Sequence, residues 1–465
     1  MSRHELPKER LGTLDPKGKR IFPHPMAVRG FFRKYRTYVY WALIAFFMVL
    51  PWIKIGGHQA VLIDIPNRQF AFFGLTFWAH DIPLIFFLLA GGALTLALVT
   101  AVWGRVWCGW ACPQTVFIDA IYRKVETWIE GSHTKRMKLD QAPWSKEKIF
   151  KKSLKWLAYF IISAHIAHSF AAYFVGAEEL LKMSLMAPTE NWTTFLIVFF
   201  ITALLMFDFG WFREQFCVIM CPYGRIQSVL MDDDSLAVVY DPNRGEPRKG
   251  YVPEGETQGD CINCFKCVAV CPTGIDIRRG IQMECIACTA CIDACDEVME
   301  KVKKPKGLIR YDSEGALSGK PKKVWKPRTF IYISLVILSF VGLFYFISQR
   351  TDVHLQVLRT YEEPYKKISD NELTNHFKVR LKNQLFDPVK VSIESTSKDI
   401  ELIAPMFPLE LDPGEDSTPH FFVKFKDHLT QESGKHLTPV KFKIISKNSD
   451  SEISEQISLV GPIKK

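Results

Sequence analysis

Several features that would assign a function directly are missing from this sequence. It has no glycine-rich phosphate loop and no dinucleotide-binding fingerprint that opens a helix after a strand, so we expect no NAD or flavin site of its own. No cysteine follows Cys295, so the segment 350–465 is expected to hold neither a disulfide nor a metal cluster. No small-residue cleavage site follows the first apolar stretch, which argues against a cleavable signal peptide. The mean hydropathy of +0.03 is too low for a chain embedded wholly in a membrane.

Long apolar stretches are present instead, separated by charged segments. The 35 Phe and 12 Trp exclude a disordered chain. Five stretches are almost free of charge and close to the roughly 17–25 residues that cross a bilayer core. They are residues 37–53, 82–103, 156–177, 191–212 and 329–349. Because buried core helices of this length rarely occur five times in one chain, the sequence predicts five transmembrane helices.

The basic residues predict how these helices are oriented. Residues 1–36 and the loop 104–153 hold ten Lys and Arg each, whereas the loops 56–80 and 178–190 hold one each. Cytoplasmic loops of membrane proteins carry the excess of Lys and Arg. We therefore expect a multi-pass protein of the inner, cytoplasmic membrane, with the segments 1–36 and 213–328 in the cytoplasm and 350–465 in the periplasm. The basic cytoplasmic segments account for most of the net charge of +10, so the charge does not require a nucleic-acid partner.

The C-terminal segment has the pattern of a β-structure. Apolar and polar side chains alternate along residues 377–382, 389–394, 421–425 and 440–444. Alternation of this kind, with turns such as 412–414, is typical of a half-buried antiparallel sheet. About 100 residues of it fit a small β-sandwich.

Eight cysteines form two copies of the run C-x2-C-x2-C-x3-C. In bacterial two-cluster ferredoxins the first three thiolates of a run bind one 4Fe–4S cluster and the fourth binds the other. The predicted ligands are Cys261, Cys264, Cys267 and Cys295 for one cluster, and Cys285, Cys288, Cys291 and Cys271 for the second. A pair of zinc sites is the alternative, but zinc needs only four ligands, and the doubled run is far more specific.

The other four cysteines form two C-x3-C-P motifs, each after a predicted membrane helix. They are Cys108 and Cys112, before Pro113, and Cys217 and Cys221, before Pro222. Thiols four residues apart share one face of a helix, so each pair could chelate a soft ion. If the two helices are neighbours, the four thiols suit Cu(I) or a further iron–sulfur cluster. Buried structural cysteines are the alternative.

Two histidines, His165 and His168, lie in the middle of the third predicted helix. Polar groups at that depth are candidates for function. They could hold a haem, bind a quinone headgroup or ligate copper, or they could form hydrogen bonds between helices. For Asp208, in the fourth predicted helix, a functional role and a structural hydrogen bond between helices are likewise both open.

The sequence resembles the polyferredoxin family of cytochrome oxidase accessory proteins, CcoG, also called FixG or RdxA. The resemblance rests on the cysteine motifs, the outer loop 63–70 and the segment 107–110, and it extends over nearly the whole chain. The sequence also resembles the membrane ferredoxins of nitrate-reductase systems, which share the C-x3-C-P motif but lack the β-rich tail. The resemblance to the CcoG family implies an immunoglobulin-like fold for the tail, a role in assembly of a cbb-type cytochrome c oxidase, and reduction of Cu(II) to Cu(I). The partners it implies are oxidase subunits or copper-transport proteins.

The expected fold is therefore a multi-domain membrane protein with a bundle of five transmembrane helices. A cytoplasmic α+β ferredoxin domain and an all-β immunoglobulin-like sandwich complete it. The first functional hypothesis is a cupric reductase that takes electrons from a soluble donor. The second is an electron relay between a quinol or soluble donor and a membrane partner complex, without copper. The third is an assembly scaffold whose clusters only sense the redox state.

Overall fold

The computed structural model describes two compact units. It covers residues 20–55, 58–66, 69–78, 81–250, 257–321, 325–349, 351, 353–360, 363–369, 371–385, 387–395, 397, 399–430, 434–446 and 450–463. The first unit comprises Met1–Ile53 and Phe86–Leu343, and the second comprises Lys54–Ile85 and Phe344–Lys465. Most of the basic N-terminal segment 1–36 and part of the loop 63–70 lie outside the described ranges.

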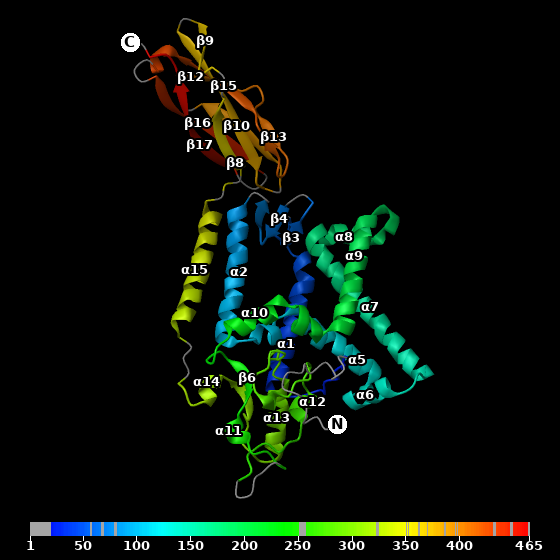
Figure 1. The fold of residues 1–465 in the computed structure, drawn as a ribbon. Helices are drawn as coiled ribbons and strands as arrows, with labels where there is room; N and C mark the ends of the chain where they lie inside the picture. Colours follow the sequence, from blue (N-terminus) through cyan, green and yellow to red (C-terminus); the bar gives the residue numbers. More distant parts are fainter. Residues whose placement is uncertain are drawn as a thin grey trace. The chain divides into compact units, whose positions relative to one another are not determined.

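Within these described ranges, four helices are long and apolar enough to cross a membrane (Figure 1). They are α2 (Ile82–Trp103), α7 (Lys146–Val175), α9 (Trp192–Leu205) with its π-helical extension η5 (Met206–Phe212), and α15 (Pro327–Ser348). They correspond to the predicted stretches 82–103, 156–177, 191–212 and 329–349. Helix α7 begins earlier than predicted because the Ser145 side chain caps it, accepting a hydrogen bond from the Lys148 amide, and it ends at Gly176, where φ is 97°.

The first predicted span also forms a helix, α1 (Phe31–Val49), but it is not among these four. Arg33, Lys34 and Arg36 lie in its first two turns, so its uncharged part is shorter than the about 20 residues that cross a bilayer core. The start of α1 is fixed by Asp293, whose carboxylate accepts hydrogen bonds from the amides of Phe32 (3.1 Å) and Arg33 (2.7 Å). A fifth membrane span therefore remains a prediction.

Shorter helices connect and cover the long ones in the first unit. They are α3 (Val106–Trp110), α4 (Pro113–Phe117), α5 (Arg123–Glu130), α6 (His133–Gln141), α8 (Ala177–Leu185) and α10 (Pro222–Leu230). Two further π-helical turns, η3 (Ile118–Tyr122) and η6 (Phe216–Met220), interrupt regular helix close to the C-x3-C-P motifs. π-turns of this kind are frequent at functional sites.

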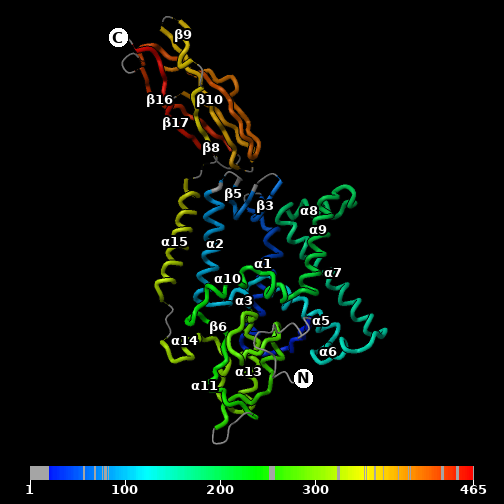
Figure 2. Tube along the Cα trace, viewed as in Figure 1, coloured from blue at the N-terminus to red at the C-terminus, as the bar shows by residue number. Residues whose placement is uncertain are grey.

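The segment with the eight clustered cysteines folds around a two-stranded antiparallel sheet. Strands β6 (Ala237–Tyr240) and β7 (Ile309–Asp312) pair, and the short helices α12 (Lys266–Ala269) and α13 (Ala290–Lys301) carry cysteines between them. The remaining short elements are α11 (Pro242–Gly245), η7 (Ile277–Arg279) and α14 (Glu314–Leu317). Helix α13 packs against the start of α1, so this segment is part of the first unit rather than a separate module (Figure 2).

The second unit is a β-sandwich with two small additional sheets, β1–β2 and β3–β4–β5. In the sandwich, β12, β15, β10 and β14 form one layer, with β8 and β9 also paired to β10, and β13, β11, β16 and β17 form the other. The bounds are β8 (Val353–Arg359), β9 (Lys366–Ser369), β10 (Glu372–Asn383), β11 (Val389–Ser395), β12 (Ile400–Ile403), β13 (Leu409–Leu411), β14 (Asp416–Ser417), β15 (His420–Lys426), β16 (Lys435–Ile445) and β17 (Asp450–Val460). The loop after α1 contributes β1 (Lys54–Ile55), β2 (His58–Gln59), β3 (Val61–Asp64), β4 (Gln69–Phe72) and β5 (Leu75–Trp78).

Burial within the sandwich follows the alternation seen in the sequence. Along β10, Phe377, Val379 and Leu381 are buried while Lys378 and Arg380 are exposed. These side chains meet those of β15 and β16 in one continuous apolar core. The all-β prediction for the tail is therefore confirmed.

Candidate metal centres

The two ferredoxin runs share an unusual backbone geometry around their central cysteines. Asn263 and Phe265, on either side of Cys264, have φ values of 56° and 58°. Ala287 and Thr289, on either side of Cys288, have φ values of 51° and 60°. Non-glycine residues avoid this left-handed region at a cost of roughly 1–2 kcal/mol each. Its repetition at four equivalent positions shows that the two runs form loops of the same unusual shape, and strained backbone of this kind clusters at functional sites.

The eight thiols are divided between two cavities. One cavity is lined by Cys261, Cys264, Cys267 and Cys295. The other is lined by Cys271, Cys285, Cys288 and Cys291, and Cys267 also reaches it. These are the two sets that the spacing predicts, with the last cysteine of each run placed beside the other run. Each cavity therefore gathers at least four thiols, the donor set that a 4Fe–4S cluster needs.

Electrostatic interactions link the same thiols. Burial, followed by Asp296, Cys261 and Cys264, raises the pKa of Cys295 to about 12. Burial and then Cys288 raise the pKa of Cys271 to about 11. The interacting thiols come from both runs: Cys295 of the second run lies near Cys261 and Cys264 of the first, and Cys271 of the first run lies near Cys288 of the second.

Helix α13 connects the two cavities. Cys291 and Cys295 lie four residues apart on it, about one 5.4 Å turn, yet they line different cavities. Cys267 lines both. Two centres held in these cavities are therefore close neighbours.

The two C-x3-C-P motifs also repeat one backbone arrangement. In each motif the first cysteine lies in a helical turn, α3 for Cys108 and η6 for Cys217. The second cysteine is extended, with ψ of 125° at Cys112 and 112° at Cys221, and the following proline starts a new helix. The thiols of a pair therefore do not share the face of one continuous helix, as the spacing had suggested. The break that the proline was expected to cause is present.

The four thiols of these motifs converge. Burial comes first among the causes that raise the pKa of Cys108 to about 11, and Cys112 and Cys221 add to it. Burial and then Glu214 raise the pKa of Cys217, with further contributions from the other three thiols. Gln227 Nε2 donates a hydrogen bond to Cys108 Sγ at 3.2 Å. Gln215, only 4% exposed and two residues before Cys217, has no partner for either polar side-chain atom in the described part of the chain. Four neighbouring thiols, one of which accepts a hydrogen bond from Gln227, are a donor set for a sulfur-binding metal centre.

This four-thiol site lies against the second ferredoxin loop. A Cβ on Gly109, next to Cys108, would lie 2.4 Å from the carbonyl oxygen of Ala287, next to Cys288 in that loop. Gly109 also contacts α1, because the Tyr40 hydroxyl donates a hydrogen bond to its carbonyl at 2.5 Å. Arg105 donates to the carbonyls of Met283 and Cys285, and it also reaches Gly224 in the other C-x3-C-P motif. The Cys108 and Cys217 side chains pack against the same apolar cluster as Cys288. The two ferredoxin cavities and the four-thiol site thus form one continuous series.

The histidines of α7 do not join this series. His165 is exposed, and His168 Nδ1 lies 2.7 Å from the Ala164 carbonyl of its own helix. Asp208 accepts a hydrogen bond from Gln114 at 2.9 Å. Across the ranges that the structure describes, no three His, Cys, Asp or Glu side chains are arranged to hold a single metal ion. The ferredoxin thiols instead line two small cavities, with at least four thiols in each.

Sequence reasoning did not identify Gly109, Gln227, Gln215 or Arg105. Gly109 could have been identified from the sequence, because a glycine inside a short cysteine motif often marks a close backbone approach. No sequence pattern distinguishes the two glutamines and the arginine, since their importance depends on contacts with distant segments.

Comparisons with known proteins match each part of this arrangement. Residues 212–314 match a family model described as "4Fe-4S dicluster domain". Residues 83–131 and 191–232, which contain both C-x3-C-P motifs, match one described as "4Fe-4S binding domain". Residues 343–462 match the "IG-like fold at C-terminal of FixG".

Three relatives show how far the similarity extends. The nitrogen fixation protein FixG of Rhizobium meliloti is 35% identical, covering 82% of this chain and 80% of its own. The protein RdxA of Cereibacter sphaeroides is 37% identical, covering 77% of this chain and 79% of its own. The ferredoxin-type protein NapH of Haemophilus influenzae is 24% identical, covering 59% of this chain and 88% of its own.

Proposed function

Because the chain belongs to the FixG/RdxA family, we propose that it is a membrane-bound iron–sulfur electron-transfer protein that reduces Cu(II) to Cu(I) for assembly of a cbb-type cytochrome c oxidase. The observation that carries the proposal is the continuous series of three thiol groups. It runs from the first ferredoxin cavity through the second to the four-thiol site beside the membrane helices.

The chain's own residues hold and space the centres of this series. When bound, 4Fe–4S clusters supply one-electron carriers at potentials that the protein tunes. Helix α13 fixes the separation of the first two sites through Cys291 and Cys295. Gly109 allows the four-thiol site to approach the Ala287 backbone. Gln227 donates a hydrogen bond to Cys108, which favours the more negatively charged, reduced state of a centre bound there.

We assign a third iron–sulfur cluster to Cys108, Cys112, Cys217 and Cys221, in preference to copper. The supporting finding is that the matching family model for 4Fe–4S binding spans both motifs. Copper is then the substrate: each Cu(II) takes one electron from the reduced protein and leaves as Cu(I). A soluble donor replaces that electron.

We also infer the orientation of the chain in the inner membrane. The Lys and Arg excess in residues 1–36 and 104–153 supports a cytoplasmic N-terminus and cytoplasmic ferredoxin cavities. With five spans, α1 included, the β-sandwich lies in the periplasm. A reporter fused after residue 465 tests this, since it should be active only in the periplasm. A cytoplasmic readout would mean that α1 or another span is misassigned.

The reaction is tested with the anaerobically purified, reduced chain and a Cu(I)-specific chelator. Cys264→Ser and Cys288→Ser should each remove a cluster ligand and abolish Cu(II) reduction. Cys108→Ser should spare the iron of the ferredoxin cavities and still stop the reaction. Ser228→Ala, beside Gln227 on α10, is the matched control and should reduce copper like the wild type. A fully loaded, reduced protein that fails to convert Cu(II) would contradict the reductase assignment.

An electron relay without copper is the second candidate. The finding that favours it is again the 4Fe–4S model over both membrane motifs, since a third cluster needs no copper to complete the path. Reoxidation of the reduced protein by a quinone, with no response to Cu(II), would support this relay.

A further inference from the structure

A cavity of about 390 Å³ adjoins the second ferredoxin loop in the first unit. Its lining includes the side chain of Cys288 and the apolar residues Met26, Pro272 and Ile286. It also includes five cationic side chains, from α1, α5 and α6: Arg33, Arg36, Arg123, Lys124 and Arg136. Asp119 is the one carboxylate in the lining as the structure describes it.

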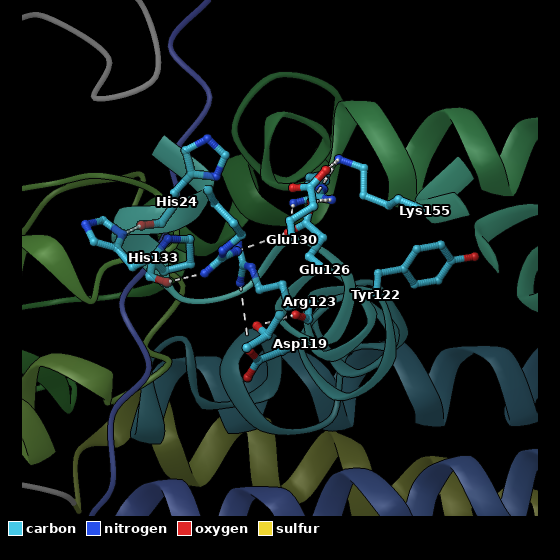
Figure 3. A network of polar contacts seen from close by, with 12 residues as sticks. His24, Asp119, Tyr122, Arg123, Glu126, Glu130, His133 and Lys155 are labelled. Carbon is cyan, nitrogen blue, oxygen red and sulfur yellow. Dashed lines mark hydrogen bonds and ion pairs between the residues drawn. The ribbon is translucent and has the colours of Figure 1, made fainter. Parts of the chain in front are cut away.

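The available carboxylates are shared among several of these cations (Figure 3). Asp119 pairs with Arg33 and with Arg36, at 2.7 Å for Arg36. It also lies 3.9 Å from Arg123, beside it in the close-up of Figure 3. Arg123 also pairs with Glu214, which lies outside the lining. The cavity wall therefore has fewer negative charges than positive ones.

Arg136 also shares its carboxylate partner with other cations. It pairs with Glu126 at 3.2 Å, and Glu126 already binds Arg213 at 2.7 Å and faces Lys155 at 3.7 Å. Counted against the carboxylates of Asp119, Glu126 and Glu214, the five lining cations leave a surplus of about two positive charges, with Cys288 left out of the count.

Several atoms of these cationic side chains lack an ion-pair or hydrogen-bond partner in the described part of the chain. Lys124 has no carboxylate within ion-pair distance in the described part of the chain, and its ammonium lies 5.0 Å from the Trp41 ring. Burial and then Arg33 lower the pKa of Lys124, and Asp119 only partly opposes them. Arg36, Arg123 and Arg136 each keep a buried Nε without a hydrogen-bond partner.

We propose that this cavity binds a phosphate monoester, with the phosphate at the cationic wall and the organic part against the apolar residues. A phosphate monoester carries about −1.5 to −2 charge at pH 7, which matches the surplus, whereas a carboxylate carries less. The fork of an arginine side chain also fits phosphate oxygens in geometry. The bound molecule lies beside Cys288 and therefore beside the middle site of the electron path. The binding itself does not depend on the proposed function.

The site is tested with the holoprotein, purified anaerobically in a neutral detergent and titrated by calorimetry. Flavin mononucleotide is the soluble probe, and riboflavin, which lacks the phosphate, is its control. Dioctanoyl phosphatidic acid is the lipid probe, with dioctanoyl phosphatidylcholine as its control. Lys124→Gln is the test variant because, within the described ranges, the Lys124 ammonium contacts the Trp41 ring and forms no ion pair. Lys138→Gln replaces an exposed lysine on α6 outside the lining and is matched in charge.

We expect saturable binding of a phosphate-bearing probe, weakened about tenfold by Lys124→Gln and unchanged by Lys138→Gln. Binding of the soluble probe alone identifies a soluble ligand, and binding of phosphatidic acid alone identifies a lipid headgroup. If no probe binds, or if both variants bind like the wild type, the proposal is wrong. The cations would then serve only to balance thiolate charge at Cys288. Copper reduction is not part of the readout, so failure here is distinguishable from failure of the reductase proposal.

Discussion

Replacing Gly109 with alanine should push the four-thiol site away from the second ferredoxin loop. The new Cβ would lie 2.4 Å from the Ala287 carbonyl oxygen and 2.8 Å from that of Ile286. Both are backbone atoms, so neither can rotate away, and Cβ contacts under 3.0 Å are essentially never found. Overpacking of this kind costs about 1–3 kcal/mol. Glycine to alanine in a helix gains roughly 0.5–1 kcal/mol, so the net effect is destabilising.

Gly92→Ala provides the matched control. Gly92 lies in α2, and nothing stands within 4 Å of its added Cβ, so only the helical gain applies. The assay is the unfolding midpoint of the loaded protein in detergent at a fixed scan rate, with the magnetic interaction between reduced centres as a second readout. Gly109→Ala should melt lower than Gly92→Ala, by about 2–4 °C for each kcal/mol, and weaken that interaction. Equal midpoints and an unchanged interaction would refute the inferred contact.

Three other perturbations have expected outcomes. Gln227→Leu removes the amide donor to Cys108 and should lower the midpoint potential of the four-thiolate centre by roughly 40 mV, or about 1 kcal/mol for one electron, in a potentiometric titration. Burial raises the pKa of Asp119, but Arg36 and Arg33 hold it well below its usual value. Asp119 therefore contributes stability above about pH 4 that is lost as the pH falls further, and Asp119→Asn should flatten that loss in acid unfolding curves. The segment 351–465, which contains the entire sandwich core, should be soluble, β-rich by circular dichroism and cooperative in melting when expressed alone; a disordered spectrum would contradict this.

The sequence predicted those features that depend on spacing and alternation. The doubled C-x2-C-x2-C-x3-C run predicted which thiols lie together, because ligand spacing restricts which thiolates can reach one cluster, and the ligation itself stays a prediction. The alternation along residues 377–382 predicted the buried face of β10, since side chains of a strand point to opposite sides. Four of the apolar stretches became helices long enough to span a membrane.

Features that depend on contacts between distant segments were not predictable in this way. The left-handed Ala287 and Thr289 are ordinary residues whose backbone is determined by the loop they close. The tight approach of Gly109 to Ala287 joins segments far apart in the chain. The cationic cavity likewise gathers Arg33, Lys124 and Arg136 from three helices. In α1, the basic residues that suggested the orientation also shorten the uncharged stretch.

The most direct test of the three-centre path is the iron and acid-labile sulfide content of the anaerobically purified chain. Three 4Fe–4S clusters correspond to about twelve iron and twelve sulfide per chain. The paired substitution Cys108→Ser and Cys221→Ser should reduce both to about eight while leaving the ferredoxin cavities loaded. Tightly bound zinc without sulfide, or the same iron content in the wild type and the paired variant, would contradict the path described here.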